Sequence, residues 1–134
     1  MSDLYRENLL DHYENPRHRG SLAGATISHE ETNPLCGDRI RIDIALSDDG
    51  ETIADIAFSG DGCIISQASA SMLMEDVIGK AVADALATDR QHVLDLVGAP
   101  LTPSRMKCAL LGLKVMKTGL ANWRLARGES SGLA

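Results

Sequence analysis

Three cysteines and one aspartate are the residues of this chain whose chemistry most needs an explanation. Cys36 and Asp38 stand two apart in the stretch NPLCGD, so one turn supplies both a thiol and a carboxyl group. With Cys63 and Cys108 they make four ligands, the number that closes a tetrahedral zinc site, and thiolates also hold iron-sulfur clusters. The residues alone leave the question open, because the chain has no Cys-x-x-Cys pair and free cysteines are often small buried apolar side chains.

The cysteines differ in their predicted settings. Cys63 stands at the start of a predicted helix, whose N-terminal dipole favours a thiolate. Arg105 and Lys107 flank Cys108 with positive charge, which favours the thiolate in the same way. Cys36 lies in a Pro/Gly turn, which we expect to be the most mobile and exposed of the three settings. If these residues bind a metal, Cys36 is the ligand that can swing away from it.

The hydrophobic pattern predicts the elements that position these residues. Residues 2–14 are predicted to form a helix that ends before Pro16, and residues 25–32 a short, polar edge strand. Isoleucines alternate with charged residues over 39–46, which predicts a half-buried strand, and the Asp-Gly pair at 49–50 joins it to a second strand at 52–60. A helix is then predicted to begin at Cys63 and to end at Gly79. Its inward face should carry Ile64, Ala68 and Met72, which recur at helical spacing.

The rest of the chain is predicted to be helical. Residues 80–98 hold one or two short helices, with Asp89 as a cap and Gly98 as a breaker. The strongest helix signal begins with Thr102 as N-cap and Pro103 in the first turn, followed by an inward apolar stripe of Met106, Leu110, Leu113 and Leu120. Strands followed by helices predict an α+β fold, a small antiparallel sheet packed against helices. One domain over residues 1–134 is expected, with a tail that frays from about residue 128.

Charge and composition exclude several function classes. The formal net charge of −6 argues against nucleic acid as a main ligand, because phosphate binding relies on clustered lysine and arginine. No apolar run approaches the length of a membrane span, and the amphipathic N-terminus has no apolar signal core. We therefore expect a cytoplasmic protein without a membrane partner, in which reduced thiols make a disulfide framework unexpected.

Other polar and large residues have simpler interpretations. The serines of the predicted helix after Cys63 are interpreted as a small-residue face, because no general base is indicated near Ser66, Ser69 or Ser71. Trp123 and the methionines are interpreted as core or helix packing. The histidines are interpreted as surface or helix residues rather than metal ligands: His12, His18, His29 and His92.

A family resemblance is carried by four stretches in this order: LYRENLLDHYENPRHRG, NPLCGD, GDGCIISQASASMLMEDVIGK and RMKCALLGLKVMK. Together they resemble the IscU, NifU N-terminal and SufU family of iron-sulfur cluster assembly proteins, with wording most similar to SufU, from residue 4 to about 118. The resemblance implies a SufE/IscU-like α+β fold, a SufS-like cysteine desulfurase as partner, and downstream cluster assembly proteins. It also implies a metal and sulfur site formed by Cys36, Asp38, Cys63 and Cys108.

Two features depart from the family's patterns. IscU-type members carry a histidine before the last cysteine and an LPPVK chaperone-recognition motif, where this chain has Lys107 and LTPSRMK. Arg105 and Lys107 instead match the R-x-K-C pattern of SufU-type members. Those members also carry an insert between the second and third cysteines, and the 44 residues between Cys63 and Cys108 are too few for it.

Three functions follow as alternatives. The first is a zinc-dependent, sulfurtransferase-like acceptor of persulfide sulfur, with Cys36 as the acceptor and with Arg105 and Lys107 balancing the ligands' negative charge. The second is a scaffold, not an enzyme, on which a [2Fe-2S] cluster or its iron is held transiently and passed on. The third is a structural zinc module without chemistry. The missing histidine and chaperone motif favour the first, and the missing insert favours the second.

Overall fold

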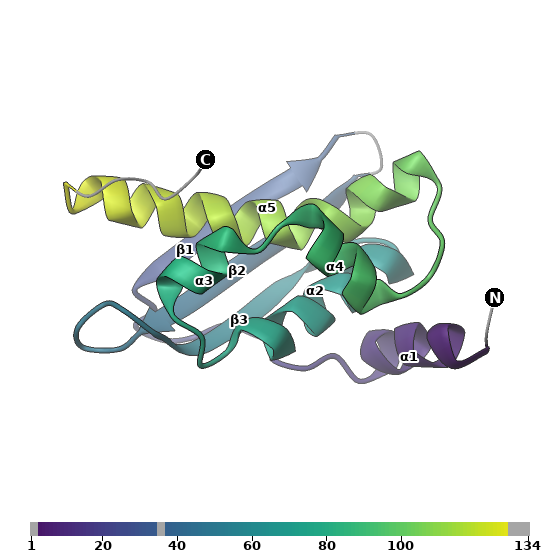
Figure 1. Cartoon of the computed structure of the whole chain (residues 1–134), viewed down its shortest axis with the longest axis horizontal. Coiled ribbons are helices and arrows are strands. Elements are labelled where there is room, and N and C mark those ends of the chain that lie inside the picture. The colour runs from purple at the N-terminus through teal and green to yellow at the C-terminus, as the bar shows by residue number, and fades with distance from the viewer. Residues whose placement is uncertain (1–2, 35–36, 129–134) are drawn as a thin grey trace.

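The computed structural model describes residues 3–34 and 37–128, and it confirms the α+β fold (Figure 1). Strands and helices follow one another as predicted, with most boundaries within two residues of the expected positions. The elements are α1 (Asp3–Glu14), β1 (Ile27–Asn33), β2 (Asp38–Leu46), β3 (Ile53–Asp61), α2 (Ile64–Val77), α3 (Val82–Ala87), α4 (Arg90–Val97) and α5 (Pro103–Ala126). Among the described residues, no helix combines the length and apolar composition that crossing a membrane requires.

The three strands form one antiparallel sheet in the order β1-β2-β3. Ile40, Ile42 and Ile44 of β2 are buried on the face that meets the helices, as their alternation with charged residues predicts. Ile42 stands opposite Phe58 of β3, which is also fully buried. The outer edge of β3 is paired by the loop after α1, where the Gly20 N–H donates to the Phe58 carbonyl at 2.8 Å.

Helices α2 and α5 cover one face of this sheet, and α1 packs on the far side of α2 (Figure 1). Helix α5 crosses β1 closely at Gly119, where an added Cβ would lie 3.1 Å from Ile27 and 3.2 Å from His29. The short helices α3 and α4 pack against α5. The N-terminal ends of α2 and α5 and the first residue of β2 thereby come to one end of the molecule.

Helix α2 is buried more completely than its sequence pattern predicted. Every residue from Ile65 to Met74 is buried, whereas Ile64 is 41% exposed. The prediction that Ile64 points inward is therefore wrong, and Ile65 takes that place. A single apolar stripe presumes one buried face, but α2 lies between α1 on one side and the sheet with α5 on the other.

The middle of α2 also anchors α1 through a buried polar network. Ser71 Oγ accepts the Arg17 backbone N–H at 2.7 Å and lies 2.8 Å from His12 Nδ1, to which its hydroxyl can donate. Burial, followed by the charge of Arg17, lowers the pKa of His12. The expectation that no base lies near the helix serines is therefore wrong for Ser71. Its complete burial still leaves it out of reach of a substrate.

The predicted helix ends are confirmed where the chain carries cap residues. The Asp89 side chain accepts the His92 N–H at 2.9 Å at the start of α4, and Gly98 ends that helix in the left-handed conformation, with φ of 70°. Thr102 accepts the Arg105 N–H at 3.4 Å at the start of α5, and Pro103 is in its first turn. These caps fix where α5 begins, and therefore where Cys108 lies in its second turn.

Candidate metal centre

Asp38, Cys63 and Cys108 meet at the end of the molecule where three elements begin. Asp38 is the first residue of β2, Cys63 is the N-cap of α2, and Cys108 lies in the second turn of α5. One carboxylate oxygen and the two sulfur atoms all lie within 4.8 Å of one another. We call these three residues the donor cluster. Cys36, the fourth residue implied by the family resemblance, lies outside the described residues.

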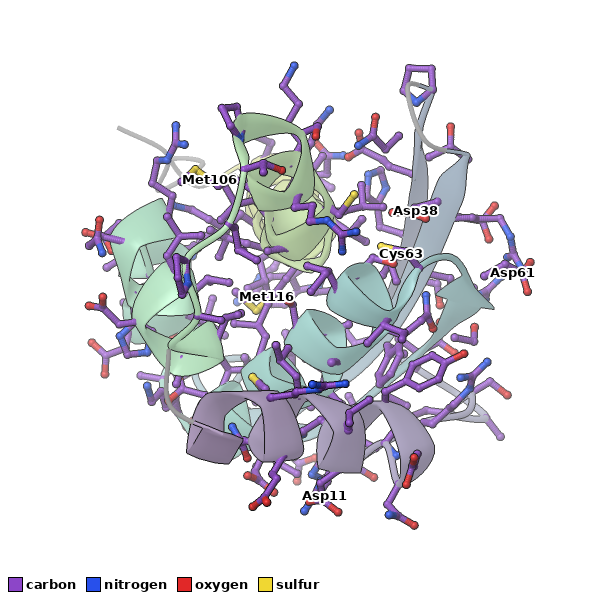
Figure 2. All side chains as sticks on the ribbon, turned by 90° about the vertical axis from the view of Figure 1, so that its right-hand side faces the viewer. Asp11, Asp38, Asp61, Cys63, Met106 and Met116 are labelled. Atoms are coloured by element: carbon purple, nitrogen blue, oxygen red, sulfur yellow. The ribbon has the colours of Figure 1, made fainter. Side chains whose placement is uncertain are left out.

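The Asp38 carboxylate is fixed by the backbone of the helix that carries Cys63. Asp38 is 2% exposed, and its Oδ1 accepts the Cys63 N–H at 3.0 Å. Its other oxygen, Oδ2, lies 3.7 Å from Cys63 Sγ (Figure 2). One oxygen therefore holds the carboxylate in place, while the other is directed to the sulfur.

This arrangement gives Asp38 a structural task that the sequence reasoning missed. The Cys63 side chain makes no cap hydrogen bond of its own, so Asp38 supplies a capping acceptor at the start of α2 from another element. A signal was present in the sequence. Cysteine is not among the side chains that cap helices well, so a helix that begins after it needs an acceptor from elsewhere.

Gly62 makes the close approach of Asp38 possible. A Cβ at this position would lie 2.6 Å from Asp38 Oδ1 and 2.5 Å from Ser66 Oγ, closer than packed atoms tolerate. The Ser66 hydroxyl donates to the Cys63 carbonyl at 3.1 Å. Gly62 and Ser66 therefore belong to the shell that positions Cys63, and Ser66 is a further site residue that the sequence reasoning did not assign.

A cleft of about 540 Å³, which we call the metal cleft, surrounds the donor cluster. Asp38 and Cys108 are buried, whereas Cys63 is exposed. Arg105 and Lys107 line the same cleft from the N-terminal part of α5. Both predicted charge-balancing residues therefore line the cleft that holds the donor cluster.

The donor cluster fits a tetrahedral zinc ion. With Zn–S bonds of about 2.3 Å and Zn–O bonds of about 2.0 Å, tetrahedral ligand atoms lie roughly 3.5 to 3.8 Å apart. The 3.7 Å between Asp38 Oδ2 and Cys63 Sγ is already within this range. All three donor atoms lie within 4.8 Å of one another, so a small contraction would bring the whole cluster to tetrahedral spacing. Two thiols with one carboxylate suit zinc or iron rather than magnesium or calcium.

The histidines lie away from the donor cluster. His29 pairs with Glu31 at 2.9 Å, and His92 pairs with Asp76 at 2.9 Å. His12 is bound to Ser71, and the His18 carbonyl accepts the Phe58 N–H. Within residues 3–34 and 37–128, the donor cluster is also the one group of three histidine, cysteine or acidic donors that lie this close together. The geometry agrees with interpreting the histidines as structural.

Comparison with known proteins places this chain in one family. Residues 4–129 match the model of the NifU-like N-terminal domain. The chain belongs to the NifU N-terminal domain family. Its match to SufU and IscU proteins over about 90% of its length or more makes it an iron-sulfur cluster assembly protein of the SufU/IscU type.

Both branches of this family are represented among similar proteins. The zinc-dependent sulfurtransferase SufU of Bacillus subtilis is 36% identical, over 90% of this chain and 92% of that protein. The iron-sulfur cluster assembly scaffold protein IscU of Aquifex aeolicus is 33% identical, over 96% of this chain and 82% of that protein. FiSufU of Fervidobacterium islandicum, described as a candidate scaffold for the SUF system, has a crystal structure that matches with a TM-score of 0.71 at 25% identity, over 89% of this chain and 98% of that one.

The two sequence alignments differ in length. The SufU alignment runs over 138 positions although it covers only 90% of this 134-residue chain, so SufU carries residues that have no counterpart here. The IscU alignment runs over 129 positions and covers 96% of the chain, almost without such gaps. Membership of the NifU N-terminal family establishes a role in iron-sulfur cluster assembly. It does not distinguish sulfur transfer from scaffolding.

Proposed function

We propose that this family member accepts persulfide sulfur from a cysteine desulfurase at a zinc site and passes it on for cluster assembly. The convergence of Asp38, Cys63 and Cys108 in a cleft lined by cations is the observation that carries the proposal. When bound, zinc supplies positive charge that keeps coordinating thiols deprotonated at neutral pH. The similarity to the zinc-dependent sulfurtransferase SufU supports the same role. The proposed ligands are Cys36, Asp38, Cys63 and Cys108.

The proposed roles follow from how firmly each residue is held. Asp38 is buried and bound to the backbone of α2, and Cys108 is buried within α5, so both are suited to retain an ion. The Cys63 carbonyl accepts bonds from the Ser66 hydroxyl and the Gln67 N–H, which restrain that cysteine as well. Cys36, which lies in the NPLCGD turn of the sequence, is proposed as the sulfur acceptor.

The transfer step is a thiol-persulfide exchange. The Cys36 thiolate attacks the outer sulfur of the desulfurase persulfide, a new S–S bond forms, and the desulfurase cysteine leaves as a thiolate. The outer sulfur moves at an unchanged oxidation level, so the step needs no external oxidant or reductant. Arg105 and Lys107 at the cleft would attract the negatively charged persulfide.

The second candidate is a scaffold that assembles and transfers a [2Fe-2S] cluster. The similarity to the Aquifex aeolicus IscU scaffold protein over 96% of this chain favours it. The same thiols and carboxylate would then hold the iron of the cluster, which is cargo rather than a resident cofactor. The two candidate functions share one site and differ in what is passed on from it, sulfur in the first and a [2Fe-2S] cluster in the second.

One experiment separates these functions. The protein is purified anaerobically, its zinc and iron are measured, and it is mixed with a cysteine desulfurase and free cysteine. Sulfur transfer predicts about one zinc per chain, faster sulfide release, and a persulfide in the Cys36 peptide by mass spectrometry. A visible absorption spectrum of a cluster that moves to an apo-protein acceptor would instead establish the scaffold. Bound zinc without either activity would indicate a structural zinc module.

A further inference from the structure

A second cleft of about 450 Å³ adjoins the metal cleft along the outer side of α5. Asn33, Pro103 and Lys107 line both clefts, so the two lie side by side. Figure 2 looks onto this end of the molecule, with Met106 on one side of α5 and with Asp38 and Cys63 on the other. The walls of the second cleft come from the end of β1, the start of α4 and the first three turns of α5. We call it the basic groove.

The lining of the basic groove combines an apolar floor with cations. Met106, Leu110 and Leu111 supply the floor, and Met106 and Leu110 are only half-buried although the sequence predicted them to point inward. Two prolines add further apolar surface. The cations are Arg90, Lys107 and Lys114, and none of the described residues that line the groove is acidic. The lining of the groove is therefore positively charged, although the chain as a whole has a net charge of −6.

The cations of the groove remain accessible to a partner. Arg90 and Lys107 are exposed. Lys114 Nζ lies 3.1 Å from Glu31 Oε1, and Glu31 also pairs with His29. The Lys114 side chain is nevertheless 65% exposed, so this contact leaves most of it in solvent. Exposed pairs of this kind are weak, and Lys114 can exchange Glu31 for a carboxylate of another protein.

We propose that the basic groove binds a segment of the cysteine desulfurase in which carboxylates flank apolar side chains. The inference rests on the proposed function for the identity of the partner. The apolar floor favours aliphatic or aromatic side chains, while three cations without an acidic neighbour in the lining favour carboxylates and repel lysine and arginine. Because the groove adjoins the metal cleft, such a segment would lie beside the donor cluster, where the persulfide must arrive.

Charge reversal in the groove tests this proposal. Arg90→Glu and Lys114→Glu are compared with Arg124→Glu, a matched change at the far end of α5 and outside the groove. Binding of the zinc-loaded protein to the desulfurase is measured by biolayer interferometry at low and high salt. Each groove variant should weaken binding about ten-fold at low salt, and the difference should shrink as salt is raised. Arg124→Glu should bind like wild type.

Two checks guard against an indirect effect. Zinc content should stay at the wild-type level in both groove variants, because neither Arg90 nor Lys114 lines the metal cleft. Lys114→Gln removes the charge without placing a second carboxylate beside Glu31, and it should show a smaller loss in the same direction. Wild-type affinity in all groove variants would overturn the groove proposal and leave the proposed function standing.

Failure of the wild-type protein to bind the desulfurase would contradict the proposed function instead. The groove is then decided with two synthetic peptides, one of alternating leucine and glutamate and one of alternating leucine and lysine. Amide NMR shifts at Met106 and Leu110 that appear with the first peptide and not with the second support the groove. Absence of shifts with the first peptide, or equal shifts with both, overturns it.

Discussion

Helix α2 carries two polar clusters, one at its N-terminus in the metal cleft and one at its middle against α1. In the middle cluster, Ser71 accepts from Arg17 and can donate to His12, so donors and acceptors match. In the metal cleft, Asp38 accepts from the backbone N–H and the thiol of Cys63, but Asp38, Cys63 and Cys108 all become negative when they lose a proton, and their donor atoms lie within 4.8 Å. Like charges this close cost free energy unless a cation lies among them.

This contrast separates a structural polar cluster from a functional one in this protein. The buried Ser71 network is complete with the chain's own groups and fastens α1 to α2. The donor cluster gathers three groups that become anions on losing a proton, and Arg105 and Lys107 line the same cleft. The first arrangement is suited to stability, and the second to binding a cation and an anionic sulfur species.

The largest expected effect comes from the cysteine that the structure leaves undescribed. Cys36→Ser should abolish both the stimulation of sulfide release and the persulfide, because a hydroxyl does not replace the attacking thiolate. Mass spectrometry of the Cys36 peptide and a sulfide assay check this. A persulfide that appears on Cys108 instead, or continued stimulation by the variant, would mean that the roles of the cysteines are assigned wrongly.

Removal of the metal should have the next largest effect. A strong chelator should lower the melting temperature of the wild-type protein by about 10 °C, since a ligand held at 1,000 times its Kd stabilises by about 4 kcal/mol. Asp38→Ala should remain folded but lose most of its zinc and most of this response. Asp61→Ala, an exposed carboxylate at the end of β3, is the control and should behave like wild type. An unchanged melting temperature in chelator, with no zinc found in wild type, would contradict the metal site.

A smaller effect is expected from the cations beside the donor cluster. Lys107→Ala should keep its zinc, because an ammonium group is a poor zinc ligand, while alkylation of the reactive thiol should require a higher pH. Lys107→Arg should restore the wild-type alkylation profile. Zinc analysis and the pH dependence of alkylation check these outcomes. Stoichiometric loss of zinc in Lys107→Ala would show that the residue does more than balance charge.

The smallest effect concerns the middle cluster and depends on pH. The pKa of His12 is lowered from its ordinary value of 6.5 by burial and then by the charge of Arg17. Below pH 6.5 the unfolded chain therefore binds more protons at His12 than the folded chain does. The contribution of His12 to the free energy of unfolding is fully present above pH 6.5, and it falls as the pH drops towards the lowered pKa of the folded state.

Urea unfolding at a series of pH values measures this dependence. His12→Gln should make the free energy of unfolding less dependent on pH between neutral pH and the lowered pKa of folded His12, because glutamine does not titrate there. His92→Gln, at an exposed position whose histidine pairs with Asp76, is a control that leaves the His12 contribution in place. An identical pH dependence in wild type and His12→Gln would contradict the assignment of this linkage to His12.

The elements of the fold and the residue types of the donor cluster could be predicted from the sequence. The alternation of Ile40, Ile42 and Ile44 follows from the two-residue period of a strand, and Thr102 with Pro103 marks the start of α5 through local backbone chemistry. These are effects of neighbours in the chain. The quoted motifs likewise predicted the family and the α+β fold, and the comparisons and the structure confirm both.

How these elements share their surfaces depends on contacts between residues that are distant in the sequence. Asp38 caps a helix that begins 25 residues later, and His12 meets Ser71 across 59 residues, and no local pattern encodes either distance. Packing of α2 on two sides exposed Ile64 and buried Ile65, while the outer side of α5 left Met106 and Leu110 half-buried in the basic groove. A periodic pattern shows that a helix has an apolar face. Which neighbours cover that face depends on how all the elements pack together.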